Sequence, residues 1–195
     1  MEKLVNTLHL DAKNAGVSYP QMSFCRWVMD LFVPNYSFKY IKLLRYKEYY
    51  KNKGTIFFKL IAKYYEIKLH KLGTKLGFYI PKDVFEAGLY IPHTGSVIVN
   101  PLAKVGKNCQ INNNVVIGQV DGFAPIIGDN VYIGPGAVIS GNITIADNVW
   151  IGANAVVTKS VKEERVLVAG IPAVVVARKV ENWVKVFNKI KEAKQ

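Results

Sequence analysis

Histidine is the side chain in this sequence best suited to acid–base chemistry, and one of the three histidines stands out by its position. His9 lies in a weakly patterned N-terminal stretch and His70 near the end of a basic stretch, so we expect both at the surface. His93 lies six residues before Val99, where a regular repeat begins. An imidazole with a pKa of about 6.5 can take a proton from a hydroxyl at neutral pH. His93 is therefore a candidate general base; the alternative is a histidine that only fills a turn.

The repeat around His93 is an aliphatic residue at every sixth position. Ten positions share it: Val99, Val105, Ile111, Ile117, Ile127, Ile133, Ile139, Ile145, Ile151 and Val157. A period of six fits neither an α-helix nor a plain strand, and it predicts a coil in which three short strands make one turn of a triangular prism. Asparagine recurs three positions after the aliphatic residue, at Asn108, Asn130, Asn142 and Asn148. Gly and Asn suit corners that need left-handed backbone angles, so we predict a mainly β fold, a parallel β-helix.

One step of the repeat is longer than the others. Ile117 and Ile127 are ten residues apart, which is one hexad plus four extra residues. The extra residues belong to the segment 119–125, which does not fit inside the coil and must project from a corner as a loop. Loops that leave a rigid repeat at one place often carry function.

Cysteine and histidine counts exclude several kinds of site. Cys25 and Cys109 are too few for a disulfide scaffold, and no Cys-x-x-Cys pair or Cys/His cluster indicates zinc. A β-helix carbonic anhydrase needs three histidines for its zinc ion, whereas His93 is the only histidine in the repeat. We therefore expect no metal, and neither cysteine is placed to suggest a covalent intermediate.

The flanks of the repeat are predicted to be helical, which divides the chain into a helical domain at 1–77, a β-helix at 78–178 and a C-terminal amphipathic helix at 179–195. Residues 1–21 show no clear periodicity. Breakers and capping residues predict helices over 23–33, 37–51 and 55–72, the last one stopped at Gly73. We expect the C-terminal helix to pack across the end of the prism.

Positive charge is concentrated in these flanks. The net charge is +12, yet residues 78–160 carry 4 Lys and Arg against 5 Asp and Glu, whereas residues 1–77 carry 14 against 5. The basic helices are rich in aromatic residues, so they are either a solvated amphipathic cap or a face for an anionic membrane surface. Nucleic acid is not expected, because no reading motif accompanies the charge. Without a signal segment or an apolar run of about 20 residues, we expect a cytoplasmic protein, with the inner face of the membrane as an alternative.

The residues around His93 resemble a known family. Residues 88–99 read Gly-Leu-Tyr-Ile-Pro-His-Thr-Gly-Ser-Val-Ile-Val, and residues 168–173 read Val-Ala-Gly-Ile-Pro-Ala. Together with Ile-Gly-Pro-Gly-Ala from Ile133 and Ile-Gly-Ala-Asn-Ala from Ile151, they resemble the hexapeptide acyltransferases, and within them serine acetyltransferase and its relatives. The resemblance covers about residues 78–178 and implies a left-handed parallel β-helix with His93 in the place of the catalytic histidine.

The resemblance also implies a donor, an assembly and binding residues. The donor is acetyl-CoA, attacked directly by an acceptor hydroxyl that His93 deprotonates, and the assembly is a homotrimer in which the projecting loop of one subunit closes the site of the next. Residues expected to contact coenzyme A are Gly118, Gln119, Gly134, Pro135, Gly152 and Ala153. Lys159 and Arg178, or Lys179, are expected to pair with its phosphates, although plain surface charge is the alternative.

Two departures from the family concern the acceptor. Phe78 stands where serine acetyltransferases have an aspartate that orients the histidine, and Phe123-Ala124-Pro125 replaces the Arg-His-Pro of their loop. A backbone carbonyl, Asp83 or Glu86 would then orient His93. We therefore expect an O-acetyltransferase that acts on a sugar hydroxyl of a surface or capsular polysaccharide or its precursor. The alternatives are a serine O-acetyltransferase and a non-catalytic β-helix scaffold.

Overall fold

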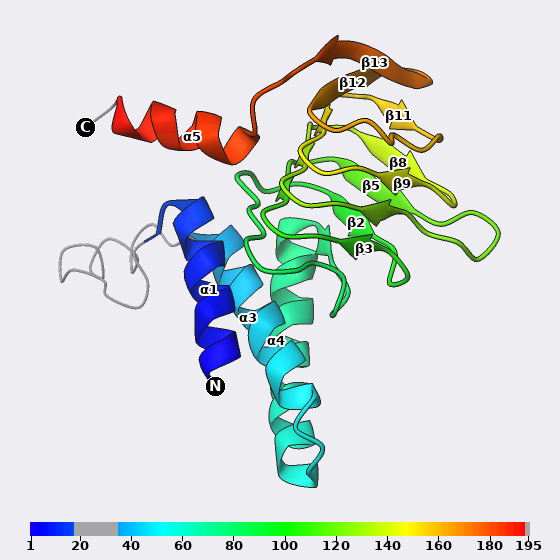
Figure 1. The fold of residues 1–195 in the computed structure, drawn as a ribbon. Helices are drawn as coiled ribbons and strands as arrows, with labels where there is room; N and C mark the ends of the chain where they lie inside the picture. Colours follow the sequence, from blue (N-terminus) through cyan, green and yellow to red (C-terminus); the bar gives the residue numbers. More distant parts are fainter. Residues whose placement is uncertain (18–34, 194–195) are drawn as a thin grey trace.

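Four described helices and a stacked coil of short strands make up most of the chain (Figure 1). The computed structural model describes residues 1–17 and 35–193, so the helix predicted over 23–33 lies outside the described residues. The helices are α1 (Glu2–Ala15), α3 (Tyr36–Lys51), α4 (Ile56–Leu76) and α5 (Trp183–Glu192). Helices α1, α3 and α4 lie side by side against the N-terminal end of the coil, and α5 lies beside it. None of the described helices is long and apolar enough to cross a membrane.

The coil is a parallel β-helix, as the hexad repeat predicts. Its strands are β1 (Phe78–Tyr79), β2 (Val97–Val99), β3 (Lys104–Val105), β4 (Gln110–Ile111), β5 (Val115–Gly118), β6 (Ile126–Ile127), β7 (Tyr132–Ile133), β8 (Val138–Ser140), β9 (Thr144–Ile145), β10 (Trp150–Ile151), β11 (Val156–Val157), β12 (Val166–Gly170) and β13 (Ala173–Arg178). They form sheet A (β1-β2-β5-β8-β11), sheet B (β3-β6-β9) and sheet C (β4-β7-β10-β12-β13). The three sheets are the faces of the prism.

Strand register confirms the inserted loop. Ile98 pairs with Val116 and Val138 with Val156, 18 residues apart, so one turn is three hexads. Val116 pairs with Val138, 22 residues apart, and the four extra residues lie between β5 and β6. There Val120 and Phe123 exchange two backbone hydrogen bonds of 2.9 Å and form the tip of the loop.

The core of the β-helix includes all ten aliphatic residues of the repeat, each at most 2% exposed. Asn108, Asn130 and Asn148 have the positive φ angles expected of the corners. Asn142 does not, because Gly141 supplies the left-handed angle at that corner with φ 95°. The hydrophobic period therefore predicted the core correctly, and one of the four corners shifts by a residue.

The helices differ from expectation at two places. Residues 2–15 form α1, which the weak periodicity of this stretch did not predict. Helix α4 begins as expected after its N-cap Thr55 but continues past Gly73 to Leu76. Gly73 does not end the helix because its missing side chain is a packing requirement: a Cβ there would lie 2.6 Å from the Phe78 carbonyl oxygen.

Charged side chains fasten the helices to the first coil. Arg45 of α3 and Asp11 of α1 form a fully buried ion pair of 2.9 Å. The Arg45 guanidinium also donates to the backbone carbonyls of Phe85 and Glu86, both at 2.7 Å. The carboxylate of Asp11 accepts from the N–H groups of residues 88 and 89. Burial alone would lower the pKa of Arg45, but Asp11 and Glu48 raise it, so the cation is held.

The C-terminal segment does not cross the end of the prism, so that expectation was wrong. Strand β13 runs antiparallel to β12 at the edge of sheet C, and α5 then returns along the molecule toward the first coil (Figure 1). Trp183 is 2% exposed, stacks on Tyr90 and donates its indole N–H to the carbonyl of Asn108. The amphipathic face of α5 therefore covers side chains of sheet C, where Tyr90 also lies 5.4 Å from the ring of Phe187.

Candidate active site

His93 lies at the corner between sheet C and sheet A, which we call the C–A corner, and its side chain is exposed. In later coils this corner consists of residues 112–114, 134–137 and 152–155. Gly95, with φ 132°, bends the chain after His93, and its N–H donates to the carbonyl of Leu76 at 3.1 Å. The histidine is therefore held on a hydrogen-bonded turn with its imidazole open to solvent, as a general base requires.

Four of the predicted coenzyme A contacts stack at the same corner. Gly134 and Pro135 lie in one coil and Gly152 and Ala153 in the next, and the N–H of Asn154 donates to the carbonyl of Pro135 at 2.9 Å. Pro135 and Ala153 are exposed. Because parallel strands are spaced about 4.8 Å apart, these residues and His93 form one column along the edge of the prism.

The small residues in this column have a structural cause of their own. A Cβ at Gly134 would lie 2.7 Å from the carbonyl oxygen of Ile151 and 2.8 Å from the nitrogen of Ala153. At Gly152 it would lie 3.1 Å from the Cβ of Ala169. Close stacking of the coils therefore requires or favours glycine at both positions, so these glycines do not by themselves indicate a ligand.

Three other predicted residues lie at the next corner, between sheet A and sheet B, which we call the A–B corner. Gly118 ends β5, Gln119 begins the projecting loop, and Lys159 follows β11. A Cβ at Gly118 would be in ordinary contact, 3.6 Å from the Cβ of Ser140, and no left-handed angle requires glycine there. Gly118 thus leaves space that packing does not demand. Within one chain the width of sheet A separates this corner from His93.

Arg178 lies apart from both groups. It ends β13 opposite Val166, at the corner between sheet B and sheet C (the B–C corner), and its exposed side chain pairs with Glu163 at 3.0 Å. Lys179 follows it directly. The nine predicted site residues therefore occupy three corners, and the structure brings five of them together, including His93.

The two carboxylates considered for orienting His93 lie elsewhere. The backbone N–H of Asp83 donates to Glu48 at 2.8 Å, and the Glu86 carbonyl accepts from Arg45, both on the side of the coil that faces α3. Phe78 is 5% exposed and makes an edge-on contact with Tyr40 at 5.2 Å. The position of the family's aspartate is therefore part of the apolar core beneath α3 and α4.

Sheet A presents an apolar outer surface that the sequence reasoning missed. Tyr79, Ile98, Val116, Val138 and Val156 are aligned in register across its five strands. Tyr79 is 63% exposed and Ile98 47% exposed. The signal was in the sequence, since each of these residues directly precedes or follows an inward-facing one. An uncovered apolar surface of this kind marks an interface.

Comparison with known proteins agrees with this geometry. Residues 124–159 match the family described as bacterial transferase hexapeptide (six repeats). The chain therefore contains hexapeptide transferase repeats, and it is similar to serine acetyltransferases. It is 37% identical over 123 residues to serine acetyltransferase 1, chloroplastic, from Arabidopsis thaliana, a match that covers 61% of this chain and 36% of that protein. The chain thus spans about a third of the length of this curated relative.

Solved structures resemble the hexapeptide-repeat chain over nearly its whole length. Serine acetyltransferase from Neisseria gonorrhoeae superposes with a TM-score of 0.70 at 26% identity, covering 91% of this chain and 68% of that one. Serine acetyltransferase from Brucella abortus, solved in complex with coenzyme A, gives a TM-score of 0.68 at 27% identity, with coverage of 91% and 69%. The likeness therefore includes helices as well as the hexapeptide coils.

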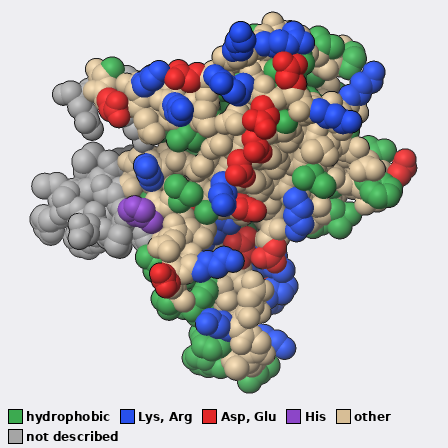
Figure 2. All heavy atoms as spheres, in the orientation of Figure 1, with side chains coloured by type: hydrophobic (Ala, Val, Ile, Leu, Met, Phe, Trp, Pro, Cys, Tyr) green, Lys and Arg blue, Asp and Glu red, His purple; other side chains and the backbone are tan. Residues whose placement is uncertain are grey.

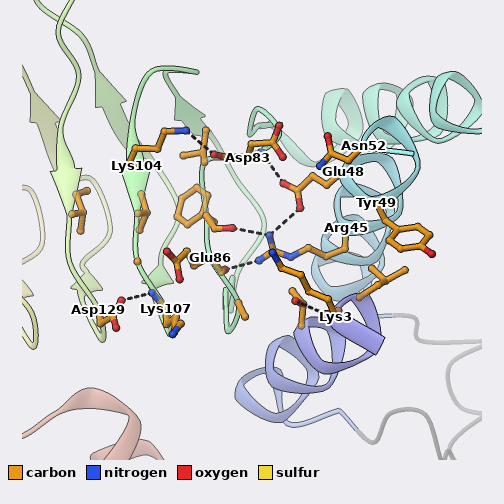
Figure 3. A pocket seen from close by; sticks show the side chains of 18 of the residues that line it. Lys3, Arg45, Glu48, Tyr49, Asn52, Asp83, Glu86, Lys104, Lys107 and Asp129 are labelled. Atoms are coloured by element: carbon orange, nitrogen blue, oxygen red, sulfur yellow. Dashed lines mark hydrogen bonds and ion pairs between the residues drawn. The ribbon is translucent and has the colours of Figure 1, made fainter. Parts of the chain in front are cut away.

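Figure 3 shows a large cavity of this protein, and no residue of the C–A corner lines it. It has a volume of about 1000 Å³ and lies between α1, α3 and sheet B. Several of its polar groups are paired: Lys104 donates to the backbone carbonyl of Asp83 at 3.0 Å, the backbone N–H of Lys107 donates to the Asp129 carboxylate at 2.7 Å, and Arg45 pairs with Glu48 at 3.1 Å. The cavity contains none of the predicted site residues, and we regard it as the seam between the helices and the coil.

The described part of the chain contains neither a reactive cysteine nor a metal site. Cys109 is buried beneath the first coils, and burial raises the pKa of its thiol, so it is not a nucleophile. The described residues contain no group of three or more His, Cys, Asp or Glu side chains able to hold a metal ion. His93 remains the exposed titratable candidate in the corner column.

Proposed function

We propose that this protein is an acetyl-CoA-dependent O-acetyltransferase with L-serine as its acceptor. The observation that carries the proposal is the exposed His93 at the head of a column of exposed corner residues. The relatives support the acceptor: they are serine acetyltransferases, and the Neisseria gonorrhoeae enzyme was also solved in complex with serine. They favour serine over the sugar hydroxyl that the sequence analysis put first.

His93 acts as a general base in the proposed reaction. Its neutral imidazole takes the proton of the acceptor hydroxyl while the oxygen attacks the carbonyl carbon of the thioester. The C–O bond forms, the C–S bond breaks, and the imidazolium returns the proton to the leaving thiolate. Backbone N–H groups beside the corner stabilise the oxyanion. The buried Cys109 takes no part, so transfer is direct.

A trimer would unite the two separated corners. If sheet A faces a threefold axis, the C–A corner of each subunit meets the A–B corner of its neighbour, because these corners bound sheet A on its two sides. The apolar column from Tyr79 to Val156 supports this arrangement by supplying a surface to bury. His93 of one subunit would then face Gly118 and the loop of the next.

The proposed trimer assigns roles to the other predicted residues. Gly118, with space beside it, and Gln119 would admit the acyl donor from the neighbouring subunit, while Pro135 and Ala153 would line the pantetheine arm by their backbone. Lys159 is the better phosphate partner, since Arg178 lies at the outer corner and already pairs with Glu163. We propose three units accordingly: residues 1–77 anchor the coil, 78–178 carry the site, and 179–195 cover sheet C.

A sugar hydroxyl is the second candidate acceptor. The observation that favours it is the loss of two polar groups: Phe78 is buried in the core, and the loop tip presents Val120 and Phe123, which are 49% and 56% exposed. With Asp121 exposed between them, the tip offers no cationic side chain to the carboxylate of serine. The two acceptors therefore predict opposite results in one assay.

Thiol release from acetyl-CoA tests the proposal. The protein should release coenzyme A with L-serine and not with nucleotide sugars, and His93→Ala should lower kcat by at least about a hundredfold. His70→Ala, an exposed histidine on α4, is the matched control and should retain full activity. Release with a nucleotide sugar alone would favour the second candidate. Equal rates for wild type and His93→Ala would instead support a non-catalytic scaffold.

A further inference from the structure

The first half of α4 exposes an apolar face that the fold does not use. Its side chains recur at helical spacing on one side, and they are between 49% and 75% exposed: Ile56, Phe57, Leu60, Tyr64 and Ile67. The opposite side of the helix packs on α3, where Tyr65 stacks on Tyr46 and Tyr50 at 5.1 and 5.7 Å. The exposed face is thus presented by a rigid hairpin, and its apolar character is not needed to fold it.

Lysine side chains border this face. Helix α4 contains five lysines and one acidic residue, Glu66. Hydrogen bonds from Lys63 and then Lys47 lower the pKa of Glu66 to about 2, and both lysines pair with it at 2.8 and 3.1 Å. Lys68 lies 4.4 Å from the ring of Tyr64, at the edge of the apolar face. The surface therefore combines exposed aliphatic and aromatic groups with positive charge.

The α3–α4 hairpin projects away from the β-helix, and its tip lies at the far end of the molecule from β13 (Figure 1). Hydrophobic side chains and lysines are interleaved at this lower tip (Figure 2). A tip of this shape can touch an extended flat surface while the C–A corner stays clear of it. The corner with His93 would remain open to small molecules.

We propose that this face of α4, residues 56–71, docks on an anionic lipid bilayer. Charge complementarity selects this partner. Two copies of the face would bring lysine rows together, which is repulsive, whereas anionic headgroups attract each lysine side chain. Apolar side chains enter the boundary between headgroups and acyl chains, and lysine stems extend toward the phosphates. The subunits of the proposed trimer would present three such faces in parallel.

Vesicle sedimentation tests this with the full-length protein. Binding is expected to vesicles of phosphatidylcholine mixed with phosphatidylglycerol, and not to phosphatidylcholine alone. Leu60→Gln should weaken binding about tenfold. The double variant Lys68→Gln with Lys71→Gln should weaken binding about fivefold for each lysine removed. Val176→Gln and Lys162→Gln, at exposed positions on the β-helix, are matched controls and should bind as wild type.

Three outcomes would overturn the proposal. One is absence of binding to the mixed vesicles, and another is equal binding by Leu60→Gln and wild type. The third is a wild-type protein that binds no vesicles but self-associates with rising concentration, or binds a single-stranded oligonucleotide, and that loses this association in Leu60→Gln. Thiol release in solution should be unchanged in Leu60→Gln. Failure of vesicle binding would therefore leave the proposed acetyl transfer standing, and failure of acetyl transfer would leave the proposed membrane docking standing.

Discussion

The guanidinium of Arg45, which reaches over from α3, and the imidazole of His93 lie at two corners of the first coil, and their surroundings are opposite. At the B–C corner Arg45 is 4% exposed and makes contacts with Asp11, Glu48 and two backbone carbonyls. At the C–A corner His93 is exposed on a turn held by backbone hydrogen bonds. Both are basic side chains on the same scaffold, yet one is fixed for structure and the other is available for chemistry.

The difference shows that covered and exposed corners of the prism are stabilised in different ways. A corner covered by helices must satisfy every buried polar group, and α1 and α3 do so with a small charged network. A corner left open needs only the backbone ladder between coils, so its side chains are free to meet a substrate. The ladder positions them, and close stacking of the coils restricts only the inner positions such as Gly134 and Gly152.

The largest effect expected is on the covered corner. Arg45→Ala should lower the free energy of unfolding by about 3–5 kcal/mol, because Asp11 is left buried without its cation. Urea denaturation measures this, and Arg178→Ala is the matched control, since its exposed pair with Glu163 should contribute about 0–1 kcal/mol. Similar losses in the two variants would contradict the contrast between the covered and the open surface.

Substitution of two glycines compares a position where the coils stack closely, Gly134, with a position that has space beside it, Gly118. Gly134→Ala should destabilise by about 1–3 kcal/mol, because the added Cβ meets backbone atoms of the next coil. Gly118→Ala should change stability by less than about 0.5 kcal/mol. Thermal unfolding of the two variants measures both values. If Gly118→Ala proved as costly, the space beside it would be a packing requirement rather than room for a ligand.

An exposed ion pair provides a smaller effect, and it depends on pH. The pKa of Glu66 is lowered to about 2 by its hydrogen bonds with Lys63 and Lys47, so its contribution to stability is present above pH 4.5 and lost as pH falls toward about 2. Melting temperatures across that range should fall less steeply in Glu66→Gln than in wild type. Parallel curves would show that the pair adds nothing.

The smallest effect is expected at the open corner. His93→Ala should change the free energy of unfolding by less than about 0.5 kcal/mol, because the side chain is exposed. The same urea titration measures it, so the stability of the two corners can be compared directly. A loss of about 2 kcal/mol or more would mean that the imidazole supports the turn, and the large activity loss proposed for this variant would then need a structural explanation.

Much of the β-helix followed from the hexad period, because one buried aliphatic residue per face is a local and repeated requirement. The projecting loop followed from the one break in that period. Helix ends were harder to predict: Gly73 reads as a stop signal, but Phe78 and Tyr40 pack against it and the helix continues. Helix α1 escaped notice because two of its buried positions, Asp11 and Asn14, are polar and bond to the first coil.

The sequence by itself determined the coil, its corners and the place of His93 in the repeat, since each depends on residues a few positions apart. Tertiary structure decided which predicted residues share a corner, because coils stack residues that are 18 or 22 positions apart and separate neighbours onto different faces. It also decided the burial of Arg45 and the exposure of Leu60. Arg45 is basic yet buried and Leu60 is apolar yet exposed, because α1 and the first coil cover Arg45 whereas no described element covers Leu60.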